Sequence, residues 1–311
     1  MYDIIGDIHG YADELQSLLE RMGYARQRGC YRHAERQAIF VGDFIDRGPQ
    51  IAEVLEIVRN MHEAGAALCV MGNHEFNALA FHTRDPRQSD RFLRPHVEKN
   101  LRQHGETMRQ LSHGLLESHL AWFRSLPMWL DLGELRIVHA CWDKRHIAVM
   151  ERKLEEYGGV SADFLVDATC VGSELFDAVD DVLKGKDIWL PEGMIYEDKD
   201  GNPRRKVRVK WFHDPQVHTL ATYAMTEEHD LPESELEASV IERARPYGQH
   251  EPPVIFGHYW FGSDRPHRLA KNVACVDYSV AKQGLLCAYR WSGESELQDD
   301  HFEWVPARAA S

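Results

Sequence analysis

Five short runs of β-forming apolar residues each end in a polar tip, and this repeated pattern most limits the folds open to the chain. The runs are Tyr2–Ile5, Ala38–Val41, Ala67–Met71, Leu135–Val138 and Val254–Phe256. A strand followed by a polar tip, repeated along the chain, brings residues that are distant in sequence to one rim of a sheet. The pattern therefore predicts an α/β fold with a functional site along that rim.

The five tips carry residue types that bind metal ions. They read Gly6-Asp7-Ile8-His9-Gly10, Gly42-Asp43-Phe44-Ile45-Asp46-Arg47-Gly48-Pro49, Gly72-Asn73-His74-Glu75, His139-Ala140 and Gly257-His258. Side chains two residues apart on an extended segment point the same way, so Asp7 and His9 can hold one ion. Asp43 offers two oxygens and can bridge two ions.

Asn73, His139 and His258 can complete a second site with one amide oxygen and two imidazoles. Oxygen and nitrogen ligands without thiolate suit Mn, Fe, Zn or Co better than Ca or a structural zinc. Two ions roughly 3.5–4 Å apart can clamp the attacking and leaving oxygens of a phosphoryl group. The tips therefore predict a dinuclear site for phosphoryl chemistry.

In type and order, these motifs resemble those of the calcineurin-like metallophosphoesterases. The resemblance is to the branch that holds serine/threonine phosphoprotein phosphatases and bacterial symmetrical diadenosine tetraphosphatases, and it covers roughly residues 1–142 and 250–292. It implies a four-layer α-β-β-α sandwich of two mixed sheets, with a helical cap over the site. It also implies two divalent metal ions, with manganese favoured and Fe, Zn, Co and Ni as alternatives.

The resemblance also implies a role for each tip residue. Asp7, His9 and Asp43 are expected on the first metal, and Asp43, Asn73, His139 and His258 on the second. His74 resembles the general acid, Asp46 the carboxylate that orients it, and Arg47 and Asn73 the residues that contact the substrate. A carboxylate beside an imidazole favours the imidazolium that protonates a leaving alkoxide, and a guanidinium fits two phosphate oxygens.

The chain departs from the family pattern in two places. Many members end with Gly-His-x-His, whereas here Trp260 stands in place of the second histidine, as in the phosphoprotein phosphatase branch. A second phosphate-binding arginine does not align, and the candidates are Arg205, Arg208 and Lys210. Glu75 is expected to hold its turn, and the histidines outside the motifs, including His104, are expected to be solvated or structural.

The motifs run from position 7 to position 258, so the core does not divide into consecutive halves. We therefore predict a single catalytic domain over residues 1–311 with a cap or insertion at about 143–250. That insertion carries 14 basic and 23 acidic residues, a net charge of −9. Helices are expected over 11–22, 51–64 and much of 75–130.

Within the insertion, helices are expected at 151–157 and 173–183, and an acidic helix at 227–242. Turns are expected at 188–191 and 198–203, and an exposed strand at 204–212.

Composition limits the partners. A net charge of −14 argues against nucleic acid and anionic membranes. It is compatible with a phosphorylated substrate, because metal ions and Arg47 supply local positive charge. No apolar run approaches the length of a membrane span, no signal peptide is evident, and the six cysteines are scattered without a C-x-x-C pair. A reducing cytoplasm is the expected location, while the oligomeric state stays open.

The leading functional prediction is a bacterial-type phosphomonoesterase that resembles phosphoprotein phosphatases. It would hydrolyse phosphate esters by in-line attack of a hydroxide held between two metal ions. The main alternative is a symmetrical diadenosine tetraphosphate hydrolase that releases two ADP. A nucleotide or RNA-end phosphatase is disfavoured by the acidic charge. A non-enzymatic scaffold that resembles the retromer subunit of this fold is disfavoured because the ligand set, His74, Asp46 and Arg47 are all intact.

Overall fold

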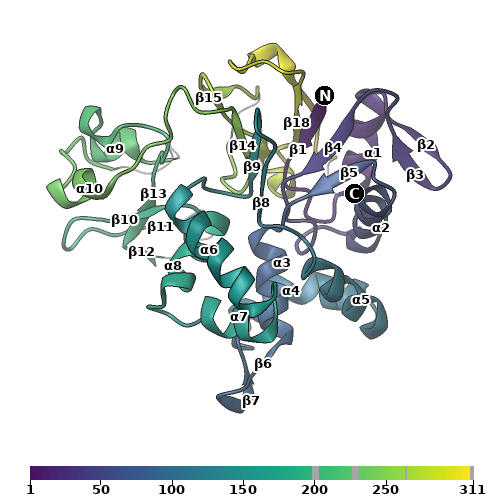
Figure 1. Cartoon of the computed structure of the whole chain (residues 1–311), viewed down its shortest axis with the longest axis horizontal. Helices are drawn as coiled ribbons and strands as arrows, with labels where there is room; N and C mark the ends of the chain where they lie inside the picture. Colours follow the sequence, from purple (N-terminus) through teal and green to yellow (C-terminus); the bar gives the residue numbers. More distant parts are fainter. Residues whose placement is uncertain (198–202, 226–230, 263–264, 309–311) are drawn as a thin grey trace.

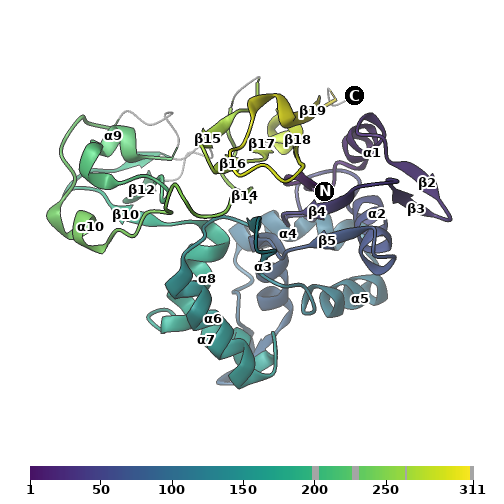
Figure 2. The same ribbon diagram turned by 45° about the horizontal axis from the view of Figure 1, so that its top comes forward.

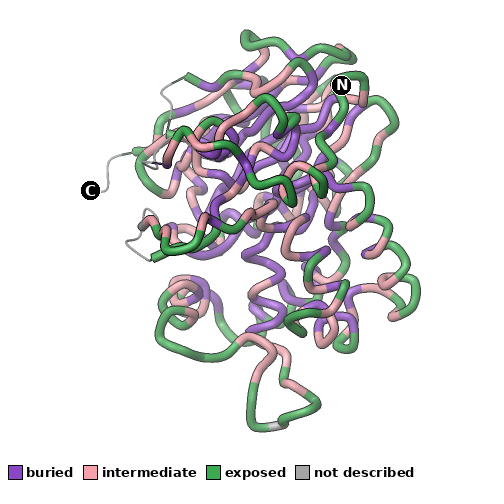
Figure 3. The backbone as a smooth tube through the Cα atoms, turned by 90° about the vertical axis from the view of Figure 1, so that its left-hand side faces the viewer, coloured by how far each residue is buried: buried purple, intermediate pink, exposed green. Residues whose placement is uncertain are grey.

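Two mixed β-sheets pack face to face, with helices on their outer sides (Figure 1). The computed structural model describes residues 1–197, 203–225, 231–262 and 265–308. Within these residues, no helix is long and apolar enough to cross a membrane. Buried backbone concentrates in the middle of the molecule, and the exposed segments form its outer loops (Figure 3).

The first sheet has six strands in the order β17-β18-β1-β4-β5, with β19 paired to β18. The strands are β1 (Tyr2–Ile5), β4 (Gln37–Phe40), β5 (Ala67–Cys69), β17 (Asp277–Tyr278), β18 (Leu285–Trp291) and β19 (Phe302–Pro306). Strands β1, β4 and β5 are parallel and are connected through α1 (Ala12–Arg21) and α2 (Ile51–Glu63). The first two predicted helices are confirmed within one or two residues. A small hairpin of β2 (Ala25–Gln27) and β3 (Cys30–Arg32) follows α1.

The second sheet has five strands in the order β15-β16-β14-β9-β8. They are β8 (Trp129–Asp131), β9 (Arg136–Val138), β14 (Val254–Phe256), β15 (Arg268–Ala270) and β16 (Val273–Cys275). Strand β14 is parallel to both β9 and β16, although it follows β9 by more than a hundred residues. The short helices η2 (Val280–Lys282) and η3 (Asp299–His301) connect the last strands.

Successive side chains along the strands point alternately to the two faces of each sheet, and both faces are covered. Ile4 and Ile255 belong to a core between the two sheets, whereas their neighbours Ile5 and Phe256 pack under the helices. All four side chains are fully buried. Because successive strand residues point to opposite faces, a strand covered on both faces needs a continuous apolar run, as these sequences have. The predicted four-layer sandwich is confirmed.

The cap follows the third tip. It consists of α3 (Asn73–His82), a hairpin of β6 (Arg84–Asp85) and β7 (Gln88–Phe92), α4 (Glu98–Gln110) and α5 (His113–Phe123). The hairpin projects from the body of the molecule (Figure 1). Helices α4 and α5 are separate because Leu111 and Ser112 have extended backbone. The prediction of a largely helical region is thus right apart from the hairpin.

The later part of the insertion has its own small core, whereas its first three helices contribute to a main core of the sandwich. Its first helices are α6 (Lys144–Tyr157), α7 (Ala162–Ala168) and α8 (Glu174–Lys184). Short elements follow: β10 (Asp187–Trp189), β11 (Tyr196–Glu197), β12 (Pro203–Arg204), β13 (Lys206–Arg208), η1 (Pro215–Val217), α9 (Leu220–Tyr223) and α10 (Ala238–Arg243). Val207, Val209 and Tyr223 anchor a hydrophobic cluster separate from the two cores of the sandwich. In Figure 2, α9 and α10 lie at the opposite end of the molecule from α1 and α2.

Three predictions in the insertion are corrected. The expected turn at 188–191 instead contributes to β10, which pairs with β13. The expected exposed strand at 204–212 is regular only over Lys206–Arg208, and its alternate valines are buried in the small core.

The acidic helix expected at 227–242 is helical only at α10, because residues 231–237 include Pro232 and a bridge from Glu235 to Thr219. The positions 227–230 of that helix, and 198–202 of the expected turn, lie outside the described residues.

Candidate metal centre

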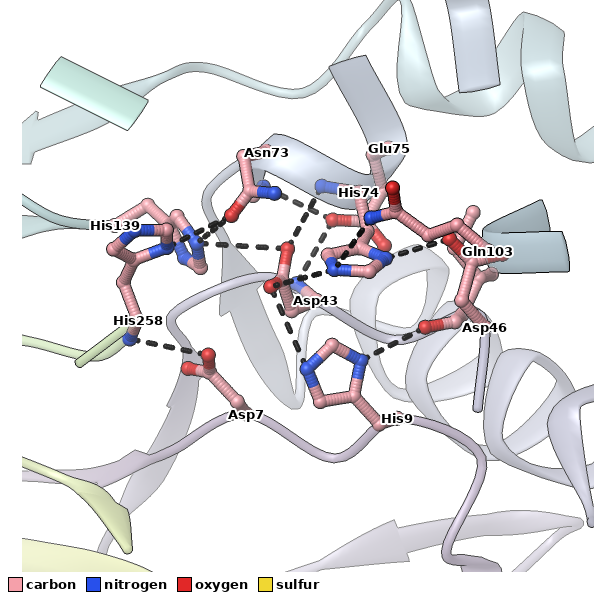
Figure 4. Close-up of polar contacts among 12 residues, drawn as sticks. Asp7, His9, Asp43, Asp46, Asn73, His74, Glu75, Gln103, His139 and His258 are labelled. Atoms are coloured by element: carbon pink, nitrogen blue, oxygen red, sulfur yellow. Dashed lines mark hydrogen bonds and ion pairs between the residues drawn. The ribbon is translucent and has the colours of Figure 1, made fainter. Parts of the chain in front are cut away.

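Asp43 lies at the middle of the gathered tips (Figure 4). One carboxylate oxygen, Oδ2, is 3.6 Å from His9 Nε2, and the other, Oδ1, is 3.5 Å from His139 Nε2. The two histidines come from the first and fourth tips, on different sheets. Asp43 is therefore placed to offer one oxygen to each half of the ligand set, as the bridging role requires.

The second half of the site converges on the Asn73 amide. Asn73 Oδ1 lies 3.0 Å from His139 Nε2 and 2.8 Å from His258 Nδ1. Asn73 is the first residue of α3, and His139 and His258 follow the neighbouring strands β9 and β14. The other ring nitrogen of His139 donates to the Val41 carbonyl oxygen over 2.8 Å, which fixes the orientation of the ring.

The first half of the site contains two buried polar atoms that fit a cation. Asp7 Oδ2 accepts a hydrogen bond from the His258 backbone N–H over 3.1 Å. Asp7 Oδ1 and His9 Nε2 are buried, and neither has a hydrogen-bond partner among the described residues. Buried polar atoms without partners are costly, and a divalent ion would supply the missing interaction. The residues therefore fit the dinuclear metal site that the motifs predict.

The candidate ligand atoms at the tips form two clusters, and within each cluster all atoms lie within 4.8 Å of one another. One holds His9, Asp43 and His74, and the other holds Asp43, His139 and His258. His74 thus joins the first cluster, while Asp7 falls outside both. All six predicted ligands still meet at one place in the fold, and their binding of metal stays a prediction.

The backbone at the tips is held in unusual conformations. His9, Asp43, Asp46, Arg47 and His258 all have positive φ, between 47° and 74°. For residues other than glycine, such angles cost about 1–3 kcal/mol each and cluster at functional sites. The fold therefore tolerates strain here in order to aim these side chains.

Two glycines allow the ligands to approach closely. A Cβ atom on Gly72 would lie 2.2 Å from Asp43 Oδ1, and one on Gly257 would lie 2.0 Å from Asp7 Oδ1. Both distances are shorter than any real Cβ contact. Only glycine leaves room for the two carboxylates at these positions.

Opposite charges are strongly coupled inside the site. Burial would raise the pKa of Asp43, but His139 and His74 hold it well below its usual range. Burial would lower the pKa of His139, but Asp43 and Asp7 raise it to about 10. Burial and Asp277 raise the pKa of Asp7 well above its usual range. A bound cation would favour the ionised Asp7 and the neutral His139, which are the forms that bind metal.

The Asp46 carboxylate contacts both His74 and residues of the cap. The Nδ1 of His74 lies 2.6 Å from Asp46 Oδ2. Asp46 Oδ1 accepts a hydrogen bond from the Thr107 hydroxyl over 2.6 Å and lies 2.8 Å from His104 Nδ1. Although Asp46 is buried, its hydrogen bonds with the two histidines hold its pKa below the usual range. The network fixes both the ring and the charge of its orienting carboxylate.

His104 and Thr107 were missed by the sequence analysis. Both are on α4 and point toward Asp46, with 4% and 0% exposure. Their spacing of three residues puts them on one helix face. Polar residues on the buried face of an otherwise charged helix were the available signal, but nothing in the sequence identified Asp46 as their partner.

Glu75 holds its own turn, as predicted, and also joins that turn to the second tip. Its carboxylate accepts hydrogen bonds from the backbone N–H groups of Gly72, Asp43 and Phe44, at 2.8–3.0 Å. Burial and the nearby Asp43 raise its pKa to about 7. The residue therefore shapes the site through the backbone.

Arg47 packs on the residue that replaces the second histidine of the family motif. Its guanidinium carbon lies 3.9 Å from the centre of the Trp260 ring. This stacking is a cation–π contact and limits the directions in which Arg47 can point.

A cleft with a volume of about 1030 Å3 opens beside the site. Its walls are the cap helices α3 and α4 on one side and α8, β12 and β13 of the insertion on the other. Seven basic residues line it: Arg47, Arg94, Lys99, Arg102, Lys184, Arg204 and Arg208. The acidic residues of the lining are Glu106 and Asp180. In a chain with a net charge of −14, positive charge is thus concentrated in this cleft.

The lining of the cleft distinguishes the three candidates for a second phosphate-binding residue. Arg208 lines the cleft, where it forms an ion pair with Asp187. Arg205 and Lys210 are not part of the described lining, and Lys210 Nζ donates to the Thr222 carbonyl oxygen over 3.0 Å. Of the three candidates, Arg208 alone shares the cleft with Arg47 among the described residues.

A third cluster of possible ligands lies elsewhere, in the insertion. It comprises Asp143, His146 and Asp181. Lys186 Nζ donates to Asp143 Oδ2 over 2.5 Å and lies 3.9 Å from Asp181 Oδ2. Arg145 Nη2 also lies 3.0 Å from Asp143 Oδ2. Because the two cations together balance the two carboxylates, the cluster is a structural ion-pair network.

The sandwich fold, with candidate metal ligands at its strand tips, is that of a metallophosphoesterase. The model of the calcineurin-like phosphoesterase family matches residues 2–259. The chain therefore belongs to the calcineurin-like phosphoesterase family, in a class of metal-dependent hydrolases. The family and fold predicted from the motifs are confirmed.

Several curated relatives of the chain are named bis(5'-nucleosyl)-tetraphosphatase PrpE (asymmetrical). The protein from Bacillus subtilis is 30% identical over 172 residues, which cover 53% of this chain and 69% of that protein. The protein from Oceanobacillus iheyensis is 27% identical over 169 residues, which cover 52% of this chain and 66% of that protein. The protein from Halalkalibacterium halodurans is 47% identical over 74 residues, which cover 24% of this chain and 30% of that protein.

Two solved structures extend over most of the chain. A cold-active protein-tyrosine phosphatase of Shewanella is 18% identical with a TM-score of 0.46, covering 99% of this chain and 80% of that one. A protein serine/threonine phosphatase of Saccharomyces cerevisiae is 12% identical with a TM-score of 0.44, covering 100% and 80%.

Proposed function

We propose that this protein hydrolyses dinucleoside tetraphosphates at a dinuclear metal centre. The observation that carries the proposal is the basic cleft beside the centre. Its volume of about 1030 Å3 is at the upper end of the ~300–1,000 Å3 of ligand pockets. Its excess of arginine and lysine suits a chain of phosphates. The name of the relatives supports the same substrate class and favours asymmetric cleavage.

The protein side chains would divide the work as follows. Asp7, His9 and Asp43 would hold the first ion, and Asp43, Asn73, His139 and His258 the second. Manganese is the proposed metal. When bound, the two ions supply a Lewis acid for the phosphoryl oxygens and activate a water molecule.

Three further residues would act on the substrate directly or through a neighbour. Arg47, fixed by its stacking on Trp260, would orient the phosphoryl group for in-line attack. His74 would hold a proton at Nε2, facing the leaving oxygen, while Asp46 holds Nδ1 at 2.6 Å. The buried network around Asp46 keeps this geometry in place.

A phosphomonoester is the second candidate substrate, and the His74–Asp46 pair favours it. A general acid helps most when the leaving group is a strong base such as an alkoxide. A nucleotide phosphate leaves easily without protonation, because its second pKa is about 6. An intact pair with a 2.6 Å contact is therefore more useful for an ester than for an anhydride.

We also propose a cytoplasmic location. All six cysteines are free, and most of them are buried. Free thiols suit a reducing compartment.

The test compares two substrates on one preparation that has been stripped of metal and refilled with Mn2+. Diadenosine tetraphosphate cleavage is followed by chromatography, and phosphate release is followed from p-nitrophenyl phosphate and a phosphopeptide. We expect ATP and AMP from the dinucleotide. Two ADP would indicate symmetrical cleavage instead. Turnover of the monoesters with an inert dinucleotide would overturn the proposal in favour of the second candidate.

A further inference from the structure

The basic residues on the cap side of the cleft are not neutralised by nearby acids. Arg94 Nη2 donates to the neutral oxygens of Asn100, over 3.1 Å, and Gln103, over 2.7 Å. Among the described residues, no carboxylate lies within 4.0 Å of the charged groups of Arg94, Lys99 or Arg102.

The acidic groups of the cleft are already paired. Glu106 lies 2.6 Å from Arg109, which lies outside the cleft lining. On the insertion wall, Asp180 lies 2.6 Å from Lys184 of the same helix, α8. The positive charge of the cap wall therefore remains available to an anion that enters the cleft.

Arg94 differs from an ordinary surface arginine. Lys99 and Arg102 are exposed residues three positions apart on one face of α4, and many such residues contact only solvent. Arg94 is partly buried, and burial lowers its pKa despite the nearby Asp46. A desolvated guanidinium bound only to amide oxygens gains more from an incoming phosphate than a solvated one does.

Arg94 is also connected to the proposed general acid, His74, through Gln103. Gln103, which accepts from Arg94, has its Nε2 3.4 Å from His74 Nε2. Arg47 and Asn73 line the same cleft at its inner end. A ligand that extends from the metal centre along the cap would therefore meet Arg94, which Gln103 connects to His74, and the more exposed Arg102 and Lys99.

We propose that Arg94, Lys99 and Arg102 bind the phosphates beyond the one that reacts, with Arg208 facing them from the insertion. The cap wall is thus a polyphosphate subsite that selects long phosphate chains over single phosphates. This inference rests on the proposed phosphoesterase site, but it does not require that the nucleoside be adenosine. The subsite recognises the charge and length of the chain.

The test measures inhibition of p-nitrophenyl phosphate hydrolysis by inorganic tripolyphosphate and by orthophosphate, with free Mn2+ held constant. The wild-type protein should bind tripolyphosphate at least about tenfold more tightly. In Arg94→Gln and in Arg102→Gln, this preference should fall about tenfold, because each variant loses charge-assisted hydrogen bonds. Arg94→Lys should restore part of it.

Arg26→Gln is the matched control. Arg26 is exposed on β2, away from the cleft, and the preference of this variant should match that of the wild type. Equal loss of affinity for both anions, or no loss for either, would overturn the subsite.

An inert dinucleotide would overturn the proposed substrate but leave the tripolyphosphate comparison intact. If p-nitrophenyl phosphate is not hydrolysed, calorimetric titration with the same two anions gives the same comparison.

Discussion

The metal centre and the insertion that forms one wall of the cleft beside it are built differently. The metal centre stands on strand tips shared by the two sheets, and Asp43 and His139 are 1% and 0% exposed. From β10 to α10, the insertion packs around a small separate core, and Trp189 and Val217 in this part are 67% and 77% exposed. The difference indicates that the double sheet fixes the position of the metal centre, whereas the insertion can change its side of the cleft without disturbing that centre.

The largest effect is expected at the shared carboxylate. Asp43→Asn removes the charge that serves both halves of the site while its backbone contacts can remain. We expect phosphoesterase activity to fall below detection and the bound-metal content to fall with it. Activity assays and elemental analysis of the purified variant check this. Full metal content in Asp43→Asn would contradict the central position assigned to Asp43.

The general-acid position should come next. His74→Asn should lower kcat for a monoester with a poor leaving group by roughly 10²–10⁴-fold while the metal content is retained. The loss should be much smaller for an anhydride, whose leaving group needs no proton. The measurement is kcat on an alkyl phosphate and on diadenosine tetraphosphate. Equal losses on both would show that His74 acts in some other way.

The cap should contribute a smaller effect through Asp46. Thr107→Val removes the 2.6 Å hydrogen bond to Asp46 but keeps the shape of the side chain. Hydrogen bonds to charged groups contribute about 1.5–3 kcal/mol. We therefore expect kcat to fall about tenfold with little change in KM, and Thr107→Ser to recover most of it. A change in KM alone would place Thr107 in substrate binding.

Two matched valines test whether the double sheet and the insertion core are stabilised independently. Val41 and Val209 are 0% and 1% exposed, in the core between the sheets and in the insertion core respectively. Each Val→Ala change should cost about 1–3 kcal/mol in the region that contains it. Val41→Ala should lower the global midpoint of unfolding and impair catalysis, since lost packing here shifts the backbone whose Val41 carbonyl accepts from His139. Val209→Ala should leave monoester turnover unchanged.

Hydrogen exchange locates the loss for Val209→Ala. Faster exchange confined to the β10–α10 part of the insertion is expected, because that part has its own core. If exchange accelerates equally in β1 and β4, then the insertion and the sandwich unfold as one unit and the comparison fails.

The strand-and-tip pattern predicted much of the fold. The parallel β1-β4-β5 unit with its two helices followed from apolar runs and helix-period residues, and these depend mainly on local sequence. The insertion was less predictable: β10 was expected as a turn, and α10 occupies only the end of the expected acidic helix. Its elements are short, and their structure depends on packing around Val207 and Val209 more than on local preference.

The residue types of the candidate metal site were determined by the sequence itself. Asp7, His9, Asp43, Asn73, His139 and His258 are recognisable because each follows an apolar run and because carboxylates, amides and imidazoles are metal-binding groups. Tertiary structure alone decided which groups surround them. His104 and Thr107 reach Asp46 across about sixty positions, and Arg94 shares a cleft with Arg208 only because the cap and the insertion line it from two sides. Contacts between residues so far apart in the sequence arise from the packing of whole elements, which local patterns do not encode.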